Sequence, residues 1–124
     1  GALEEAIRHV KARNQFGRPL SEFQVTRFKI AEMATKIRAA RNLYYEAAWQ
    51  ADQSRLEHSL VAMAKWFTAK VAVECADEAL QMHGGYGYID EYKVQRLYRD
   101  AKILEIYEGT KEIEKIIVAQ SLLK

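Results

Sequence analysis

Residues that break helices are few in this chain of 124 residues, and they occur in clusters. Proline occurs once, at Pro19, and the six glycines are at positions 1, 17, 84, 85, 87 and 109. Inside a helix, glycine costs about 1 kcal/mol and proline about 3 kcal/mol relative to alanine. The long stretches without either residue therefore predict an all-α fold, an antiparallel up-and-down bundle of four to five helices.

Apolar residues recur at helical spacing in each of these stretches, and no strand pattern is present. Ser21 and Gln24 have the form of a capping box, so the second helix is expected to begin at Ser21. The third helix is expected to end at Gly84, a natural left-handed cap, and Thr110 is expected to cap the fifth. The predicted helices cover residues 2–13, 21–51, 56–82, 91–106 and 111–123.

Inward faces follow from the same spacing. The third helix is apolar around most of its circumference, so burial on several sides is expected, in part by another subunit or domain. The second and fifth helices are expected to bury one stripe each, formed by Ile30, Met33, Ala34, Ile37, Ala40, Tyr44, Ala47, Ala48 and Ala51 and by Ile113, Ile116, Ile117 and Leu123.

Charge and composition exclude several classes of protein. Nineteen Lys and Arg against seventeen Asp and Glu give a net charge of +2, far from the basic footprint of a nucleic-acid binder. No apolar run approaches the roughly 20 residues of a membrane span, and no signal peptide is visible. The single Cys75 weakly indicates a reducing compartment and is expected to be a small buried hydrophobe. The start inside a helical pattern, without methionine, indicates a piece of a longer chain.

Few residues have the pattern of a catalytic or metal site. His9, His58 and His83 are isolated from one another in sequence, so no metal site is predicted. The glycines of Gly84–Gly87 follow a helix rather than a strand, which argues against a dinucleotide fingerprint. Glu108 lies beside Gly109 at a helix break, where a general base could project into a cavity. The alternative is an ordinary helix-end carboxylate in solvent.

Three spaced motifs together resemble the acyl-CoA dehydrogenase family over essentially the whole chain. The most specific is residues 99–113, centred on Tyr107-Glu108-Gly109-Thr110, which is similar to the C-terminal signature of that family. The two others are Arg13-x-x-Phe16-Gly17-x-x-Leu20-x-x-x-Gln24 and Gln81-x-x-Gly84-Gly85-x-Gly87-Tyr88. The resemblance implies a C-terminal helical domain spanning residues 1–124, whose N-terminal helical and middle β domains are absent from this chain.

The resemblance also implies the chemistry. In the family, the glutamate matching Glu108 removes the α-proton of an acyl-CoA thioester, and the β-hydrogen leaves as hydride to the flavin, which yields trans-2-enoyl-CoA. The backbone N–H at that position polarises the thioester carbonyl. An apolar pocket is expected around Glu108, because desolvation raises the pKa of a carboxylate. Tyr107 and Gly109 are the implied substrate-binding residues.

By the same resemblance, FAD is the cofactor. Arg13 would bind its pyrophosphate, with Phe16, Leu20 and Gln24 nearby, and Gln81, Gly84 and Gly85 would approach the adenosine diphosphate. Much of this contact crosses a subunit interface in the family, so these residues would serve the neighbour's flavin. Thr110 and Glu112 would contact the cofactor of their own site. The local alternatives are a helix anchor, a helix stop and an N-cap.

The implied setting is fatty acid β-oxidation, in the cytoplasm of a prokaryote or the mitochondrial matrix. The implied partners are an acyl-CoA substrate, an electron-transfer flavoprotein and further copies of the chain, in a dimer or tetramer. An acyl-CoA oxidase domain and a non-catalytic helical assembly module are the alternatives. The chain by itself is expected to show no turnover and little FAD binding.

Overall fold

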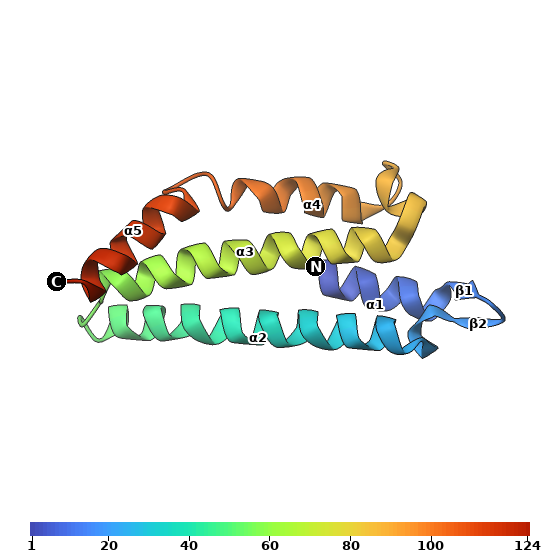
Figure 1. The fold of residues 1–124 in the computed structure, drawn as a ribbon, viewed down its shortest axis with the longest axis horizontal. Helices are drawn as coiled ribbons and strands as arrows, with labels where there is room; N and C mark the ends of the chain where they lie inside the picture. Colours follow the sequence, from blue (N-terminus) through green and yellow to red (C-terminus); the bar gives the residue numbers. More distant parts are fainter.

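The computed structural model describes all 124 residues, and it consists of five α-helices with one small hairpin (Figure 1). The all-α fold predicted from the sequence is confirmed. The elements are α1 (Ala2–Ala12), β1 (Asn14–Gln15), β2 (Arg18–Pro19), the 3-10 helix η1 (Leu20–Glu22), α2 (Gln24–Asp52), α3 (His58–His83), the 3-10 helix η2 (Gly84–Tyr88), α4 (Lys93–Ile103) and α5 (Lys111–Leu122).

Helix α3 is the central element of the bundle. It runs beside α2 along its length, and α4 and α5 follow one another along its other side (Figure 1). Helix α1 contacts α2, α3 and α4. Because α3 contacts all four other helices, its apolar circumference is covered largely within the chain. The expectation that another subunit or domain covers part of α3 stays a prediction.

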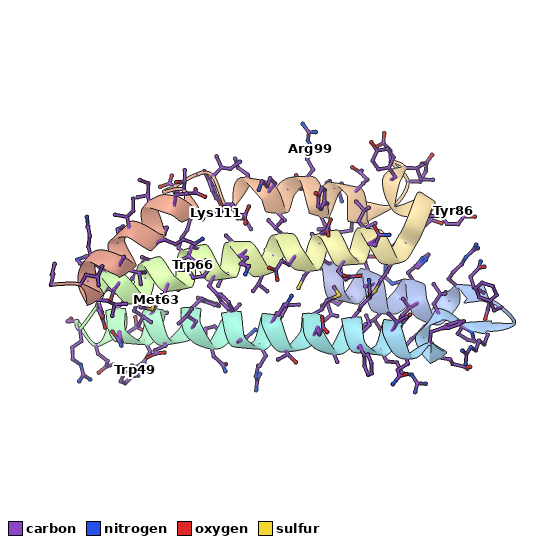
Figure 2. The ribbon with its side chains drawn as sticks, in the orientation of Figure 1. Trp49, Met63, Trp66, Tyr86, Arg99 and Lys111 are labelled. Atoms are coloured by element: carbon purple, nitrogen blue, oxygen red, sulfur yellow. The ribbon has the colours of Figure 1, made fainter.

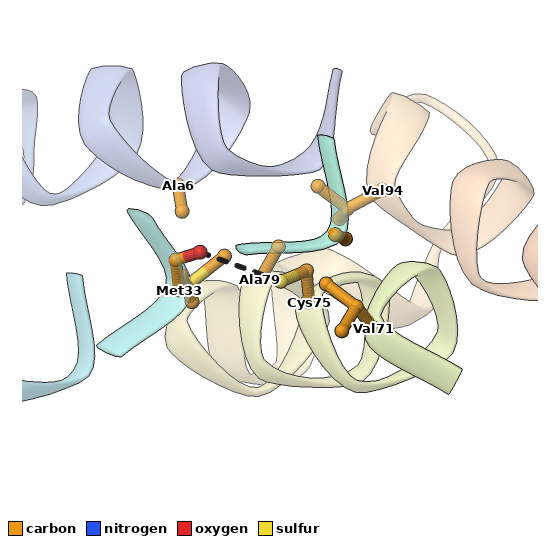
Figure 3. Close-up of a cluster of buried hydrophobic side chains, with 7 residues drawn as sticks. Ala6, Met33, Val71, Cys75, Ala79 and Val94 are labelled. Atoms are coloured by element: carbon orange, nitrogen blue, oxygen red, sulfur yellow. Dashed lines mark hydrogen bonds between the residues drawn. The ribbon is translucent and has the colours of Figure 1, made fainter. Parts of the chain in front are cut away.

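The main core lies where α1, α2, α3 and α4 meet, and Figure 3 shows its buried side chains. Most of them are small, which lets the helix backbones approach closely. Cys75 is buried as predicted, with its Sγ 3.9 Å from the carbonyl oxygen of Met33, and burial raises the pKa of its thiol. The cluster consists of Ala6, Met33, Ala40, Val71, Cys75, Ala79 and Val94.

The start of α2 differs from the prediction. Strands β1 and β2 pair in an antiparallel hairpin that periodicity did not reveal, because each has only two residues. Phe16 and Gly17 at its tip both have positive φ, 52° and 79°, the pattern of a two-residue hairpin turn. Ser21 then lies in η1, and α2 begins at Gln24 without a side-chain cap.

Two of the predicted inward faces need correction. In α2, Met33, Ala40 and Ala47 are buried, whereas Tyr44 is half exposed. In α5 the buried residue is Glu114. Because α5 packs mainly on α3, a narrower stripe is covered than the spacing suggested. The predicted residues that are exposed instead are Ala34, Ala48 and Ala51 in α2, and Ile113, Ile116, Ile117 and Leu123 at the C-terminal end.

The glycines after α3 have distinct roles. Gly84 ends the helix with φ 60°, as predicted, but its ψ of −141° lies outside the left-handed helical region. Gly87 is buried, and a Cβ there would lie 2.6 Å from the carbonyl oxygen of Leu80. Only glycine lets η2 pack this closely on α3. None of the helices combines the length and the apolarity needed to cross a membrane.

Candidate functional site

The structure separates the predicted site residues into two groups. Five of them line one cavity near the hairpin and η2, namely Arg13, Leu20, Gln81, Gly84 and Gly85. Five more lie in the α4–α5 loop, residues 104–110, or in the first turn of α5, namely Tyr107, Glu108, Gly109, Thr110 and Glu112. Phe16 and Gln24 belong to neither group. Figure 2 shows Tyr86, from the cavity, and Lys111, beside the loop, toward opposite ends of the bundle.

The length of α3 sets the separation of these groups. Lys65 of α3 contacts the α4–α5 loop, and Gln81 of the same helix lines the cavity. The two residues are 16 positions apart on one continuous helix, which corresponds to about 24 Å along its axis. One small molecule cannot bridge both groups through contacts within this chain unless it is long and extended.

The cavity has a volume of about 500 Å³ and contains one permanently charged side chain, Arg13. The guanidinium carbon of Arg13 lies 5.4 Å from the centre of the Tyr86 ring, within cation–π range. A Cβ added at Gly84 or Gly85 would meet no atom within 4 Å, so this backbone faces open space. The remaining lining residues are His9, Gln15, Leu20, Gln81, Met82, His83, Tyr86 and Ile89.

Two histidines form part of the cavity wall. The rings of His9 and His83 stack with their centres 4.0 Å apart. His83 is buried, and its Nδ1 lies 2.7 Å from the carbonyl oxygen of Ala79, so Nδ1 carries the donated hydrogen. Burial, together with the charge of His83, lowers the pKa of His9. Arg13 is therefore the permanently charged side chain of the cavity wall.

Phe16 and Gln24 do not line the cavity, although they belong to the same sequence motif. Phe16 is 92% exposed at the hairpin tip, and its ring lies edge-on to Phe23 with centres 6.4 Å apart. Gln24 is exposed at the start of α2. Both side chains are thus directed to the surface and are available to a second molecule rather than to this cavity.

Glu108 lies in the α4–α5 loop in a left-handed conformation, with φ 53°. For a residue other than glycine this costs roughly 1–2 kcal/mol, so the surrounding contacts must fix it. Gly109 follows with φ 97°. Thr110 then caps α5 as predicted, its Oγ1 accepting from the N–H of Ile113 at 3.4 Å. Glu112 is exposed in the first turn of α5.

Charged groups brace this loop from both sides. The buried carboxylate of Glu105 accepts hydrogen bonds from Lys102 at 2.5 Å and Lys111 at 3.3 Å. The hydrogen bond from Lys102, reinforced by Lys111, holds the pKa of Glu105 below its usual range despite its burial. The carboxylate of Glu114 lies so close to Gly109 that a Cβ at Gly109 would collide with it. The loop conformation is thereby fixed within this chain.

The apolar enclosure expected around Glu108 is not formed by this chain. Glu108 is exposed, and its neighbours Ile106 and Tyr107 are 51% and 47% exposed. The loop lies at the edge of the bundle, so no helix of this chain covers the carboxylate. A large apolar side chain and an aromatic side chain thus lie exposed beside an exposed carboxylate in this loop.

The chain is thus a helical bundle with a braced carboxylate loop and a separate open cavity that Arg13 lines. Comparison with known proteins identifies it. The family model described as acyl-CoA dehydrogenase, C-terminal domain, matches residues 1–123. The chain belongs to the acyl-CoA dehydrogenase family, and the resemblance read from its three motifs is confirmed.

Curated relatives match this chain over nearly its whole length. The 3-(aryl)acrylate reductase of Clostridium sporogenes is 46% identical over 123 residues, which are 99% of this chain and 33% of that protein. The caffeyl-CoA reductase-Etf complex subunit CarC of Acetobacterium woodii is 45% identical over 124 residues, which are 100% of this chain and 33% of that protein. The chain thus spans about a third of the curated relatives it matches.

Solved structures agree with the assignment. Butyryl-CoA dehydrogenase from Megasphaera elsdenii superposes with a TM-score of 0.97 at 45% identity, covering 99% of this chain and 32% of that one. A glutaryl-coenzyme A dehydrogenase superposes with a TM-score of 0.94 at 41% identity, covering 98% and 31%. The fold of this chain is therefore the helical fold found in these enzymes.

Proposed function

We propose that this chain is the C-terminal domain of an FAD-dependent acyl-CoA dehydrogenase that converts acyl-CoA thioesters to trans-2-enoyl-CoA. One observation carries the proposal: Glu108, in the sequence Tyr107-Glu108-Gly109-Thr110, is held in a left-handed loop conformation by groups of its own chain. A carboxylate whose backbone is fixed in this way suits a general base that must meet one carbon atom of a substrate.

In the proposed reaction Glu108 accepts the α-proton of the thioester. The backbone N–H of Glu108 donates to the thioester carbonyl, and it stabilises the negative charge that develops on the oxygen as the proton leaves. FAD, when bound, supplies the acceptor for the β-hydrogen, which departs as hydride. Tyr107 and Ile106 form the part of the acyl pocket that this chain contributes, and Gly109 leaves room beside the base.

The cavity residues suit the diphosphate portion of FAD. The guanidinium of Arg13 can make charge-assisted hydrogen bonds to phosphate oxygens, and the amide of Gln81 supplies a neutral donor and acceptor. Gly84 and Gly85 allow a close approach of the ligand to the backbone. A cavity of about 500 Å³ accommodates part of the cofactor, and the exposed Phe16 and Gln24 are placed to contact the rest. Thr110 and Glu112 are proposed to contact the flavin that Glu108 serves.

The separation of the two groups supports an oligomer. About 24 Å along α3 lies between them, so we assign the Arg13 cavity to the flavin of a neighbouring subunit and Glu108 to the subunit's own site. Large exposed side chains on α2 and α5, including Tyr45, Trp49 and Ile116, provide apolar surface for a dimer or tetramer. An electron-transfer flavoprotein is the proposed redox partner, and the bacterial relatives favour a cytoplasmic location.

Catalysis in the opposite direction is the second candidate. The relatives from Clostridium sporogenes and Acetobacterium woodii, 46% and 45% identical, are named as reductases. Saturation of an α,β-double bond would use the same residues: protonated Glu108 would return its proton to the α-carbon, and reduced FAD, when bound, would supply the hydride for the β-carbon. Microscopic reversibility makes the two directions a question of substrate and redox partner rather than of this domain.

The test is an assay of the flavin-loaded full-length protein against a series of acyl-CoA thioesters. Straight-chain and aryl-substituted thioesters are supplied with an artificial electron acceptor, and the corresponding enoyl-CoA thioesters with a reduced dye. We expect turnover with at least one thioester of the series in one direction. A protein that carries FAD but turns over no member of either series would contradict the proposal.

A further inference from the structure

Lys65, on α3, reaches across the bundle to the loop that carries Glu108. Its Nζ donates to the carbonyl oxygens of Leu104 at 2.8 Å, Tyr107 at 2.9 Å and Gly109 at 2.6 Å. An ammonium group has three hydrogens, and all three are used. A single side chain thus ties together three backbone groups that lie 39 to 44 residues further along the chain.

These carbonyls bracket Glu108. The first belongs to Leu104 at the end of α4, where helix carbonyls lack partners within the helix and favour a cation. The other two belong to the residues on either side of Glu108. The ring of Tyr107 also lies 5.8 Å from the ammonium nitrogen. Lys65 therefore fixes the backbone before and after the left-handed residue.

One of these contacts involves the peptide that contains the N–H of Glu108. The carbonyl of Tyr107 and this N–H belong to the same planar peptide, and the chain has no cis peptide bonds. In a trans peptide the N–H and C=O point in opposite directions. The bond from Lys65 to the carbonyl therefore aims the N–H away from α3, and a cation on the carbonyl strengthens the N–H as a donor.

No ion pair within 4.0 Å joins Lys65 to the carboxylate of Glu108. The base is thus left free of a neutralising partner, while the cation acts on the backbone around it. The neighbouring Lys102 and Lys111 are engaged by Glu105. The lysines thus have different contacts. Lys102 and Lys111 bind Glu105 and brace the ends of the loop, whereas Lys65 orients the peptide that precedes Glu108.

We propose that Lys65 is a positioning residue for the reaction. It holds the loop so that the Glu108 carboxylate is correctly placed, and it orients and polarises the Glu108 N–H that binds the thioester carbonyl. The proposal rests on the function proposed above for Glu108. Lys65 would thus help to polarise the thioester carbonyl although it contacts neither the substrate nor the carboxylate of Glu108.

The test compares Lys65→Met with Lys70→Met in the flavin-loaded full-length protein. Methionine keeps the length and helix propensity of lysine but cannot donate, and Lys70 is an exposed lysine on the same helix, 3.4 Å from Glu74. Misplacement of a reacting group by about 1 Å can cost 100-fold. We expect Lys65→Met to lower the rate constant of flavin reduction by about 100-fold at unchanged FAD content, and Lys70→Met to leave it within about twofold.

A spectroscopic readout separates polarisation from general damage. Cinnamoyl-CoA, a conjugated enoyl thioester, absorbs at longer wavelength when its carbonyl accepts a strong hydrogen bond. We expect the shift seen on binding to wild type to be retained in Lys70→Met and largely lost in Lys65→Met. Lys65→Arg retains a charge and donors, so it should fold and give an intermediate rate and shift, which keeps the test open if Lys65→Met does not load with FAD.

The outcomes are distinct. A Lys65→Met protein with the rate and shift of wild type would overturn the role of Lys65 while leaving the proposed function intact. Reduced rates with an undiminished cinnamoyl-CoA shift would overturn the polarisation role. A wild-type protein whose flavin no acyl-CoA reduces would instead reject the proposed function itself.

Discussion

Replacement of Glu108 by glutamine is expected to slow the reduction of bound flavin by acyl-CoA by about 100- to 10,000-fold, the usual contribution of a general base. Glutamine has the same shape but cannot accept the α-proton. The backbone N–H, the left-handed loop and its bonds to Lys65 are unchanged by this substitution, so acyl-CoA should still bind. Rapid mixing under anaerobic conditions, with loss of the oxidised-flavin absorbance as the signal, measures the effect.

Glu32→Gln is the matched control for this experiment. Glu32 is exposed on α2 and carries the same charge change without belonging to either candidate group. Its rate should equal that of wild type, and both variants should remain yellow. Undiminished flavin reduction in Glu108→Gln would show that the base lies elsewhere.

Replacement of Arg13 by glutamine is expected to weaken FAD binding by about 10- to 100-fold. Hydrogen bonds to charged groups contribute about 1.5–3 kcal/mol, and Arg13 is the permanently charged side chain in the cavity wall. The neutral amide can still reach toward the ligand, but it removes the attraction to a diphosphate. Titration of the apoprotein with FAD, followed by quenching of flavin fluorescence, gives the dissociation constant.

Arg18→Gln provides the comparison for Arg13. Arg13 directly precedes β1, and Arg18 lies in β2 of the same hairpin. The Arg18 guanidinium packs over the Phe23 ring at 4.1 Å, and Arg18 does not line the cavity. The Arg18→Gln substitution removes the same charge as Arg13→Gln at a nearby position. Equal losses in both variants would indicate a general electrostatic effect, and an unaffected Arg13→Gln protein would remove the cavity from the FAD site.

The helices could be predicted because their signals are local. Breaker positions, 3- and 4-residue spacing and the Thr110 cap all depend on neighbours in sequence, and the structure bears them out. The buried faces of the helices were harder to predict, because burial depends on which helix lies opposite. Nothing in the sequence around Ile113 indicates that α5 packs mainly on α3, and the central position of α3 follows only from the complete arrangement.

The same contrast between local signals and tertiary contacts applies to the candidate site. Glu108 and Arg13 could be named because they belong to motifs, whereas the groups that fix the loop belong to none. Lys65 belongs to no motif, and its three carbonyl partners lie 39 to 44 residues further along the chain. Lys111 and Glu114 are further residues of this kind. Here they bond Glu105 and pack against Gly109.

The central claim is that this domain gives a base to its own active site and a diphosphate anchor to its neighbour's. Mixed oligomers of Glu108→Gln and Arg13→Gln subunits, purified through two different tags, test it most directly. If the claim holds, one site in each mixed pair combines the intact Glu108 of one subunit with the intact Arg13 of the other, and acyl-CoA dehydrogenation is restored. Mixed oligomers no more active than the average of the two parent variants would contradict it.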